Sequence, residues 1–217
     1  MRHKIIPAIA VVFIAATFSS ATMAATFDVL ADFNDSATQP AVGNPWTYGT
    51  ETSPGAGFAL LPNFGNATCS GTGCGEQLVG GSVDNYYQDF TFSGASVGKV
   101  ATGNNLTIDG SPLLIPDDVL IMLAGSADYH TTNFVVTRFT APYAGTYSIS
   151  GSFSDLQQAS VNITLVINGA TPFSSSFDGS SAHQGDIPFL ITNVSLAAGG
   201  TVDFVVDSLG QQSDDAV

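Results

Sequence analysis

The stretch Thr146-Tyr147-Ser148-Ile149-Ser150-Gly151-Ser152-Phe153 alternates apolar residues with serines. Successive side chains of an extended chain point to opposite faces of a sheet. The alternation therefore places Tyr147, Ile149 and Phe153 on one face and the hydroxyl groups on the other. This pattern is typical of a β-strand with one face on a core and the other in water.

The same alternation recurs in residues 161–167, and Asn168-Gly169 follows it as a hairpin-type turn. Val, Ile, Thr, Phe and Tyr dominate the periodic segments, which favours strands over helices. Further strands are expected at Phe27 to Phe33, Asp89 to Phe92, Val119 to Leu123, Asn133 to Phe139, Ile187 to Leu196 and Thr201 to Val206.

Pro- and Gly-containing segments at 141–145 and 197–200 separate such strands and fit tight antiparallel connections. About ten short strands predict an all-β fold, an antiparallel β-sandwich of jelly-roll-like type, because a lone sheet would leave one apolar face in water. The glycine-rich stretch Gly49 to Gly81 shows little periodicity and is expected to be a long loop.

The N-terminus has the three-part pattern of a secretory signal peptide. Arg2 and Lys4 precede an apolar run from Ile5 to Phe18, and small and polar residues follow up to Ala25. We expect cleavage after Ala24, so that residues 1–24 are the signal peptide and residues 25–217 form a single sandwich domain. The apolar run is shorter than the roughly 20 residues of a membrane span, so no span is expected in the mature chain.

The chain is strongly acidic, with 18 Asp and Glu against 4 Lys and Arg. Only Lys99 and Arg138 remain once the expected signal peptide is removed. Such a charge repels nucleic acid and anionic lipid, so neither is an expected partner. The acidic residues either solubilise the surface or bind divalent cations.

Cys69 and Cys74 are the two cysteines and enclose a Ser-Gly-Thr-Gly spacer. Glycines allow the tight bends of a short disulfide loop, and an exported protein meets an oxidising compartment. A disulfide is therefore expected, with free thiols as the alternative. Two cysteines without a nearby histidine do not make a zinc site.

Several blocks of the chain resemble exported proteins of the PEP-CTERM group, which the bacterial exosortase system sorts. The clearest block is Val135 to Phe153, with its Thr-Ala-Pro-Tyr-Ala-Gly-Thr-Tyr centre. The other blocks are Asp32-Phe33, Asn44-Pro45-Trp46-Thr47-Tyr48-Gly49, Leu165-Val166-Ile167-Asn168-Gly169 and the run from Leu196 to Val206. The resemblance covers nearly all of the mature chain.

The resemblance implies a protein of the Gram-negative cell envelope, periplasm or extracellular matrix. It also implies a carbohydrate-binding-like fold, association with extracellular polysaccharide and no established catalysis. The chain departs from the group at Leu123-Ala124-Gly125, at Phe139 in place of Trp, and at its end, where Asp214-Asp215-Ala216-Val217 stands without the sorting tail. A truncated sequence or a released protein would explain the missing tail.

No enzyme site is expected. His130 and His183 lie outside any nucleophile motif, and Glu51 and Glu76 both fall in the expected long loop. A triad needs a base oriented beside its nucleophile, and a glycosidase needs two carboxylates held about 5 to 10 Å apart.

A glycan site on a sandwich would use exposed aromatic faces, on which the apolar face of a sugar stacks. Trp46 and Tyr48 are the first candidates, followed by Tyr86, Tyr87 and Tyr129. Trp46 and Tyr48 share one face of a strand, which fits a binding platform or a core layer.

A calcium site would need six to eight oxygen ligands. A jelly roll can bring its first and last strands together, which would join Asp32 or Asp35 to Asp207 or Asp214. Arg138 lies within an expected strand. A buried guanidinium needs a carboxylate, so a structural ion pair is favoured over a role in gripping a ligand.

Three functions follow. The favoured one is a non-enzymatic exported envelope or matrix protein, with glycan binding as its activity. The alternative is a structural or adhesive surface subunit, and the third is an enzyme acting on polysaccharide.

Overall fold

The computed structural model describes residues 9–17, 25–34, 36–67, 78–79, 81–88, 95–102, 106–108, 114–124, 134–155, 160–179 and 185–209. These residues form strands, turns and bends, and none of them is helical. The described part of the chain accordingly holds no helix of the length and apolar character needed to cross a membrane.

One layer is a six-stranded sheet in the order β15-β14-β17-β12-β3-β4. All its pairs are antiparallel. Its strands are β3 (Trp46–Glu51), β4 (Ala59–Leu60), β12 (Phe134–Thr140), β14 (Ser160–Ile167), β15 (Ala170–Asp178) and β17 (Thr201–Asp207).

The second layer is an eight-stranded sheet in the order β16-β13-β1-β11-β8-β7-β5, with β2 also paired to β1. Its strands are β1 (Ile9–Thr17), β2 (Ala25–Asp28), β5 (Asn63–Ala67), β7 (Ser82–Tyr87), β8 (Ser96–Thr102), β11 (Leu120–Leu123), β13 (Gly145–Ser154) and β16 (Asp186–Leu196). Beside it lies a small sheet of β6 (Leu78–Val79), β9 (Leu106–Ile108) and β10 (Leu114–Ile115).

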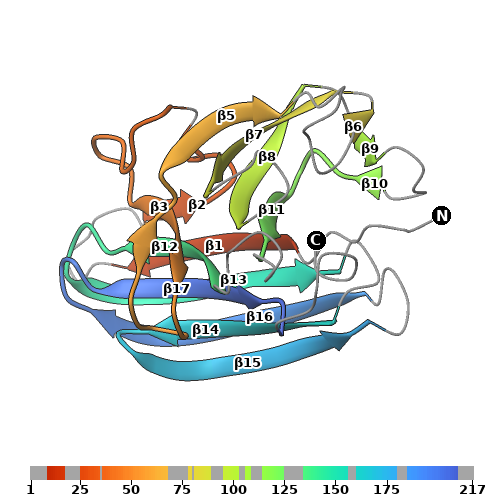
Figure 1. Ribbon diagram of the computed structural model, residues 1–217. Helices are drawn as coiled ribbons and strands as arrows, with labels where there is room; N and C mark the ends of the chain where they lie inside the picture. Colours follow the sequence, from red (N-terminus) through yellow and green to blue (C-terminus); the bar gives the residue numbers. More distant parts are fainter. Residues whose placement is uncertain are drawn as a thin grey trace.

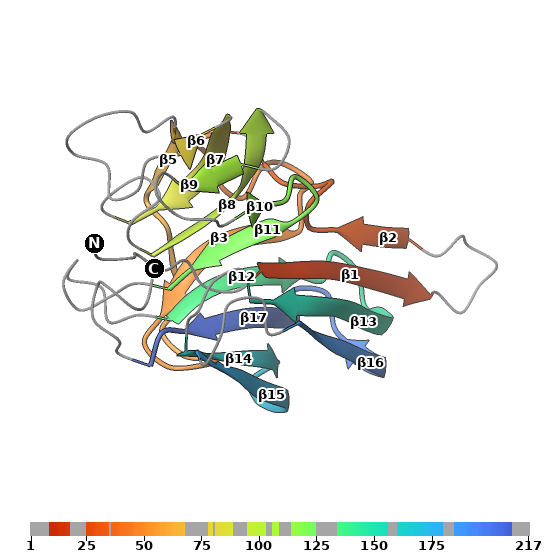
Figure 2. The same cartoon turned by 90° about the vertical axis from the view of Figure 1, so that its right-hand side faces the viewer.

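The two large sheets pack against each other around one apolar core (Figures 1 and 2). Tyr147, Ile149 and Phe153 of β13 are buried there, and the serines between them are only half-buried. Val202 and Phe204 of β17 line the core from the other layer. The alternation from Thr146 to Phe153 thus separates the core face of β13 from its outer face, as expected.

The chain changes sheet between β12 and β13 and again between β16 and β17. Because β12 pairs with β17 while β13 pairs with β16, the second pair nests inside the first. Such nested pairing folded over two sheets is the jelly-roll type of connection. The expected all-β antiparallel sandwich is confirmed.

Both connections turn a corner between sheets. At the first corner the hydroxyl of Tyr147 donates to the Tyr143 carbonyl at 2.6 Å, which is the geometry of a tyrosine corner. Burial raises the pKa of this phenol. At the same end of the sandwich β14 and β15 form the expected hairpin, with Asn168 at φ 47° and Gly169 at φ 81°, and the Asn168 amide donates to the Thr201 carbonyl.

Several expectations for the first half were wrong. The expected loop Gly49 to Gly81 contains the end of β3 and the strands β4, β5 and β6. The strand expected at Phe27 to Phe33 is β2, which ends at Asp28, and a turn follows in which the Leu30 amide donates to Asp28 Oδ1. The strand expected at Asp89 to Phe92 lies outside the described residues.

The segment expected to be the signal peptide contributes β1. This strand pairs with β13 over nine positions, from Ile9 opposite Ser154 to Thr17 opposite Thr146. It also pairs with β2 at four positions and with β11 at two. Cleavage after Ala24 stays a prediction.

Candidate functional site

The loops before β3 and at the two corners meet at one end of the sandwich. The Thr140 amide donates to the Pro45 carbonyl at 2.8 Å. Between the two corners, the Ala141 amide donates to the Gly200 carbonyl and the Gly199 amide to the Ala141 carbonyl, also at 2.8 Å. Asn44 fixes the approach to β3, because its side-chain amide donates to the Asp32 carbonyl and its oxygen accepts from the Trp46 amide. These bonds hold three separate loops in one frame.

Within this frame, residues 41–44 form a tight turn. The Asn44 amide donates to the Ala41 carbonyl at 3.0 Å, and Gly43 at the third position has φ 80°. A type II turn needs a positive φ there, which glycine adopts without steric cost. The turn leaves Val42 fully exposed.

Two adjoining hollows lie against this turn and share Gly43, Asn44 and Pro45. The larger, of about 480 Å³, is lined by Thr26, Phe27, Asp32 and residues 41–45. The smaller, of about 300 Å³, is lined by Pro40, residues 43–45, Thr47, Thr140, Ala141, Pro142 and Gly199. Both volumes fall in the range of small-molecule sites.

The chemistry of the hollows is largely neutral. Asp32 is the one charged residue among those that line them. Phe27, Val42, Pro45 and Pro142 offer apolar surface beside threonine hydroxyls and backbone. This mixture suits a neutral ligand with apolar faces and hydroxyl groups better than an ion.

The predicted aromatic platform is not formed. Trp46 and Tyr48 are fully buried and Tyr86 is 1% exposed. The Tyr48 and Tyr86 rings stack at 5.0 Å between centroids, and Trp46 packs on Phe139 at 5.2 Å. Their proposed ligand-binding role is corrected to the core alternative, because the second sheet covers the face of β3 on which Trp46 and Tyr48 lie.

Of the other candidates, Tyr87 is half-buried at the end of β7, and Tyr129 lies outside the described residues. Tyr143, which sequence reasoning did not select, is 59% exposed at the first corner. The available signal was its position in the Pro142-to-Gly145 connection between two strands, because such connections run over the surface.

Of the predicted calcium ligands, Asp32 and Asp207 do not come together. Asp32 follows β2 at the loop end that holds Thr201, whereas Asp207 is the last residue of β17. The two ends of β17 lie roughly 20 Å apart, because the strand has seven residues. Both carboxylates bind backbone amides, Asp32 that of Asp28 and Asp207 that of Leu209. Asp35 and Asp214 lie outside the described residues, which contain no group of three metal-binding side chains.

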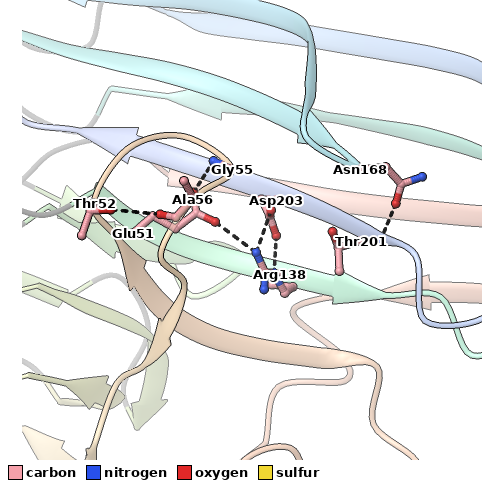
Figure 3. A network of polar contacts seen from close by, with 8 residues as sticks. All are labelled: Glu51, Thr52, Gly55, Ala56, Arg138, Asn168, Thr201 and Asp203. Carbon is pink, nitrogen blue, oxygen red and sulfur yellow. Dashed lines mark hydrogen bonds and ion pairs between the residues drawn. The ribbon is translucent and has the colours of Figure 1, made fainter.

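Arg138 forms an ion cluster on the outer face of the six-stranded sheet (Figure 3). Its Nε and Nη2 donate to the two carboxylate oxygens of Asp203, at 2.5 and 2.9 Å, and Nη2 also reaches Glu51 Oε1 at 3.0 Å. Asp203 stands opposite Arg138 in register on β17. The favoured structural ion pair is therefore present, with a second carboxylate that was not expected.

A strap of residues 52–58 covers this cluster. The Phe58 ring lies 3.8 Å from the Arg138 guanidinium carbon, and the Gly55 amide donates to Glu51 Oε2 at 2.6 Å. Phe58 also packs on a small apolar cluster of Val136, Val166 and Val205. The strap excludes water from the outer face of β3 and the core covers the other face, so all six residues of β3 are buried.

Glu51 is buried at the end of β3, which corrects its expected place in a loop. Loss of hydration is the largest influence on its carboxyl and raises the pKa from 4.5 to about 7. The Gly55 amide and Arg138 act in the opposite sense, while nearby Asp203 adds to the rise. The other glutamate, Glu76, lies outside the described residues.

Cys69, Cys74, His130 and His183 also lie outside the described residues, so the expected disulfide stays a prediction. No family model matches the chain, and no match was found among curated proteins or solved structures.

Proposed function

We propose that the protein is a non-enzymatic exported envelope or matrix protein whose hollow at the loop end binds a neutral extracellular polysaccharide. The observation that carries the proposal is the pair of adjoining hollows on a hydrogen-bonded loop frame, with Asp32 as the one charged lining residue. Apolar faces of sugar rings would pack on Phe27, Val42 and Pro142, while Asp32 and the threonine hydroxyls would bond sugar hydroxyls.

The charge of the chain supports a neutral glycan over an acidic one. At a formal net charge of −14 the protein repels polyanions, including polysaccharides rich in uronic acid. Calcium would not bridge the predicted carboxylates of Asp32 and Asp207 at opposite ends of β17. We therefore expect binding that a chelator leaves unchanged.

The alternative of a subunit that assembles through its sheet edges has less support. The long edge strands β15 and β16 contain Pro172 and Pro188, and a proline removes one donor from the edge that another strand would pair with. Exposed residues predominate along both strands.

The test is a glycan array followed by titration calorimetry with neutral glucans and uronic acid polymers. Val42→Arg places a long side chain at the rim of the larger hollow, and the full exposure of Val42 makes the fold insensitive to it. We expect neutral glucans to bind the wild type and the variant to bind them at least tenfold more weakly.

Leu190→Arg is the matched control. Leu190 is also an exposed apolar residue, at 70% exposure, but lies on β16, away from the loop end. Both variants add the same charge, so equal loss of binding in the two would assign the effect to electrostatics. Undiminished binding by Val42→Arg would overturn the hollow as the glycan site.

A further inference from the structure

Strand β1 occupies a central place in the eight-stranded sheet although it lies in the segment that export would remove. Figure 2 shows β1, in red, between β13 and β11. Its backbone pairs with β13 along its whole length of nine residues. On the other side it pairs with β11 at Ile9 and Ala10 and with β2 from Phe13 to Ala16.

Cleavage after Ala24, which belongs to the proposed function, would leave this place empty. The edge of β13 from Thr146 to Ser154 would then lose a partner at every position. Unpaired strand edges readily accept a further strand, because backbone amides and carbonyls left without partners are costly when buried. The mature sheet would thus contain a slot one strand wide.

The pairing of β1 specifies what the slot accepts. An occupant must run antiparallel to β13 and to β11. The mature N-terminus does not meet this condition as it stands, because β2 runs antiparallel to β1. Its direction is held by the Asp28–Asp32 turn, in which the Asp28 amide donates to Asp32 Oδ2.

The register also fixes which residues of an occupant stand opposite which residues of β13. Ala10 stands opposite Phe153 and Ala16 opposite Tyr147. In between, Val12 stands opposite Gly151. The segment Ile9–Thr17 is uncharged throughout, in keeping with a place inside the sheet.

We propose that the mature protein binds an extended, uncharged segment of another polypeptide by inserting it as a strand between β13 and β11. The preferred segment has nine residues and the uncharged composition of Ile9–Thr17. Main-chain hydrogen bonds to β13 supply the affinity, and the order of residues opposite β13 sets the register.

The experiment uses protein recovered from an exporting host, with its N-terminus assigned by intact mass. The probe is a fluorescent peptide of residues 9–17 with two lysines at each end for solubility. One control peptide has the same residues in scrambled order with the same lysines, which matches charge and hydrophobicity. A second carries Val12→Pro, which removes a backbone donor from the middle of the strand.

For protein that begins at Ala25, we expect saturable binding of one peptide per chain and a higher melting temperature in its presence. Both control peptides should bind at least tenfold more weakly. Protein that begins at Ala25 and binds all three peptides equally, or none, would overturn the slot and leave export intact. Protein that begins at Met1 would contradict export, and the slot proposal would fall with it.

Discussion

Replacing Glu51 with Gln should abolish one component of the pH dependence of stability. Below pH 4.5 the Glu51 carboxyl is protonated in both the folded and the unfolded chain. As the pH rises towards 7 the unfolded chain releases this proton first, because burial raises the folded-state pKa to about 7. The wild type therefore loses stability across this window, and the loss is complete above it.

The size of the effect follows from the rise in the Glu51 pKa from 4.5 to about 7. At about 1.36 kcal/mol per pKa unit, this rise corresponds to a loss of about 3 kcal/mol in the free energy of unfolding. Gln keeps the shape of the side chain but carries no titrating proton. We therefore expect the free energy of unfolding of the wild type, relative to Glu51→Gln, to fall by about 3 kcal/mol between pH 4.5 and pH 8.

Urea denaturation at half-unit steps of pH measures this difference. Trp46, the single tryptophan and fully buried, reports unfolding by its fluorescence. Asp118→Asn removes the same charge from an exposed turn and should retain the wild-type profile. Parallel profiles for the wild type and Glu51→Gln would refute the assignment of this titration to Glu51.

Three further substitutions test the packing. Trp46→Ala should lower the free energy of unfolding by about 3 to 5 kcal/mol, because the indole is buried in the core. Urea denaturation followed by circular dichroism measures this change, and a near-neutral effect would contradict the burial of Trp46. Gly49→Ala should destabilise strongly, since its Cβ would clash with the Ala59 carbonyl oxygen of β4 and lie 2.5 Å from the Phe58 ring of the strap. An unchanged melting temperature would show that β4 and the strap do not pack closely on Gly49. Tyr147→Phe should cost about 1 kcal/mol for the lost bond to the Tyr143 carbonyl, and no change in stability would argue against the tyrosine corner.

Local patterns were enough for most strands of the second half of the chain, β15 excepted. The alternation over 146–153 and 161–167 predicted β13 and β14, since a strand with one buried face repeats every two residues. Asn168-Gly169 predicted its hairpin because both residues adopt a positive φ. Arg138 within apolar neighbours predicted a carboxylate partner, because a lone guanidinium cannot be buried.

Local patterns were insufficient for the first half and for the site. Strand β3 is buried on both faces, by the core and by the strap, although Thr47, Gly49 and Glu51 on its outer face are polar or small and do not indicate burial. Strand β15 is an edge strand, and its serine-rich, largely exposed sequence resembles that of a loop. The loop-end hollow draws on residues from 26 to 199, which no local spacing connects.

The class of fold and the acidity of the molecule can be read from the chain alone, because side-chain periodicity and charge are properties of neighbouring residues. Which face each strand turns to the core, and which loops meet, depend on the folded arrangement of distant segments. Trp46 is core rather than platform because the second sheet covers it, and Glu51 joins Arg138 because β3 pairs with β12. Both outcomes depend on contacts between segments far apart in the chain, which carry no periodic signature.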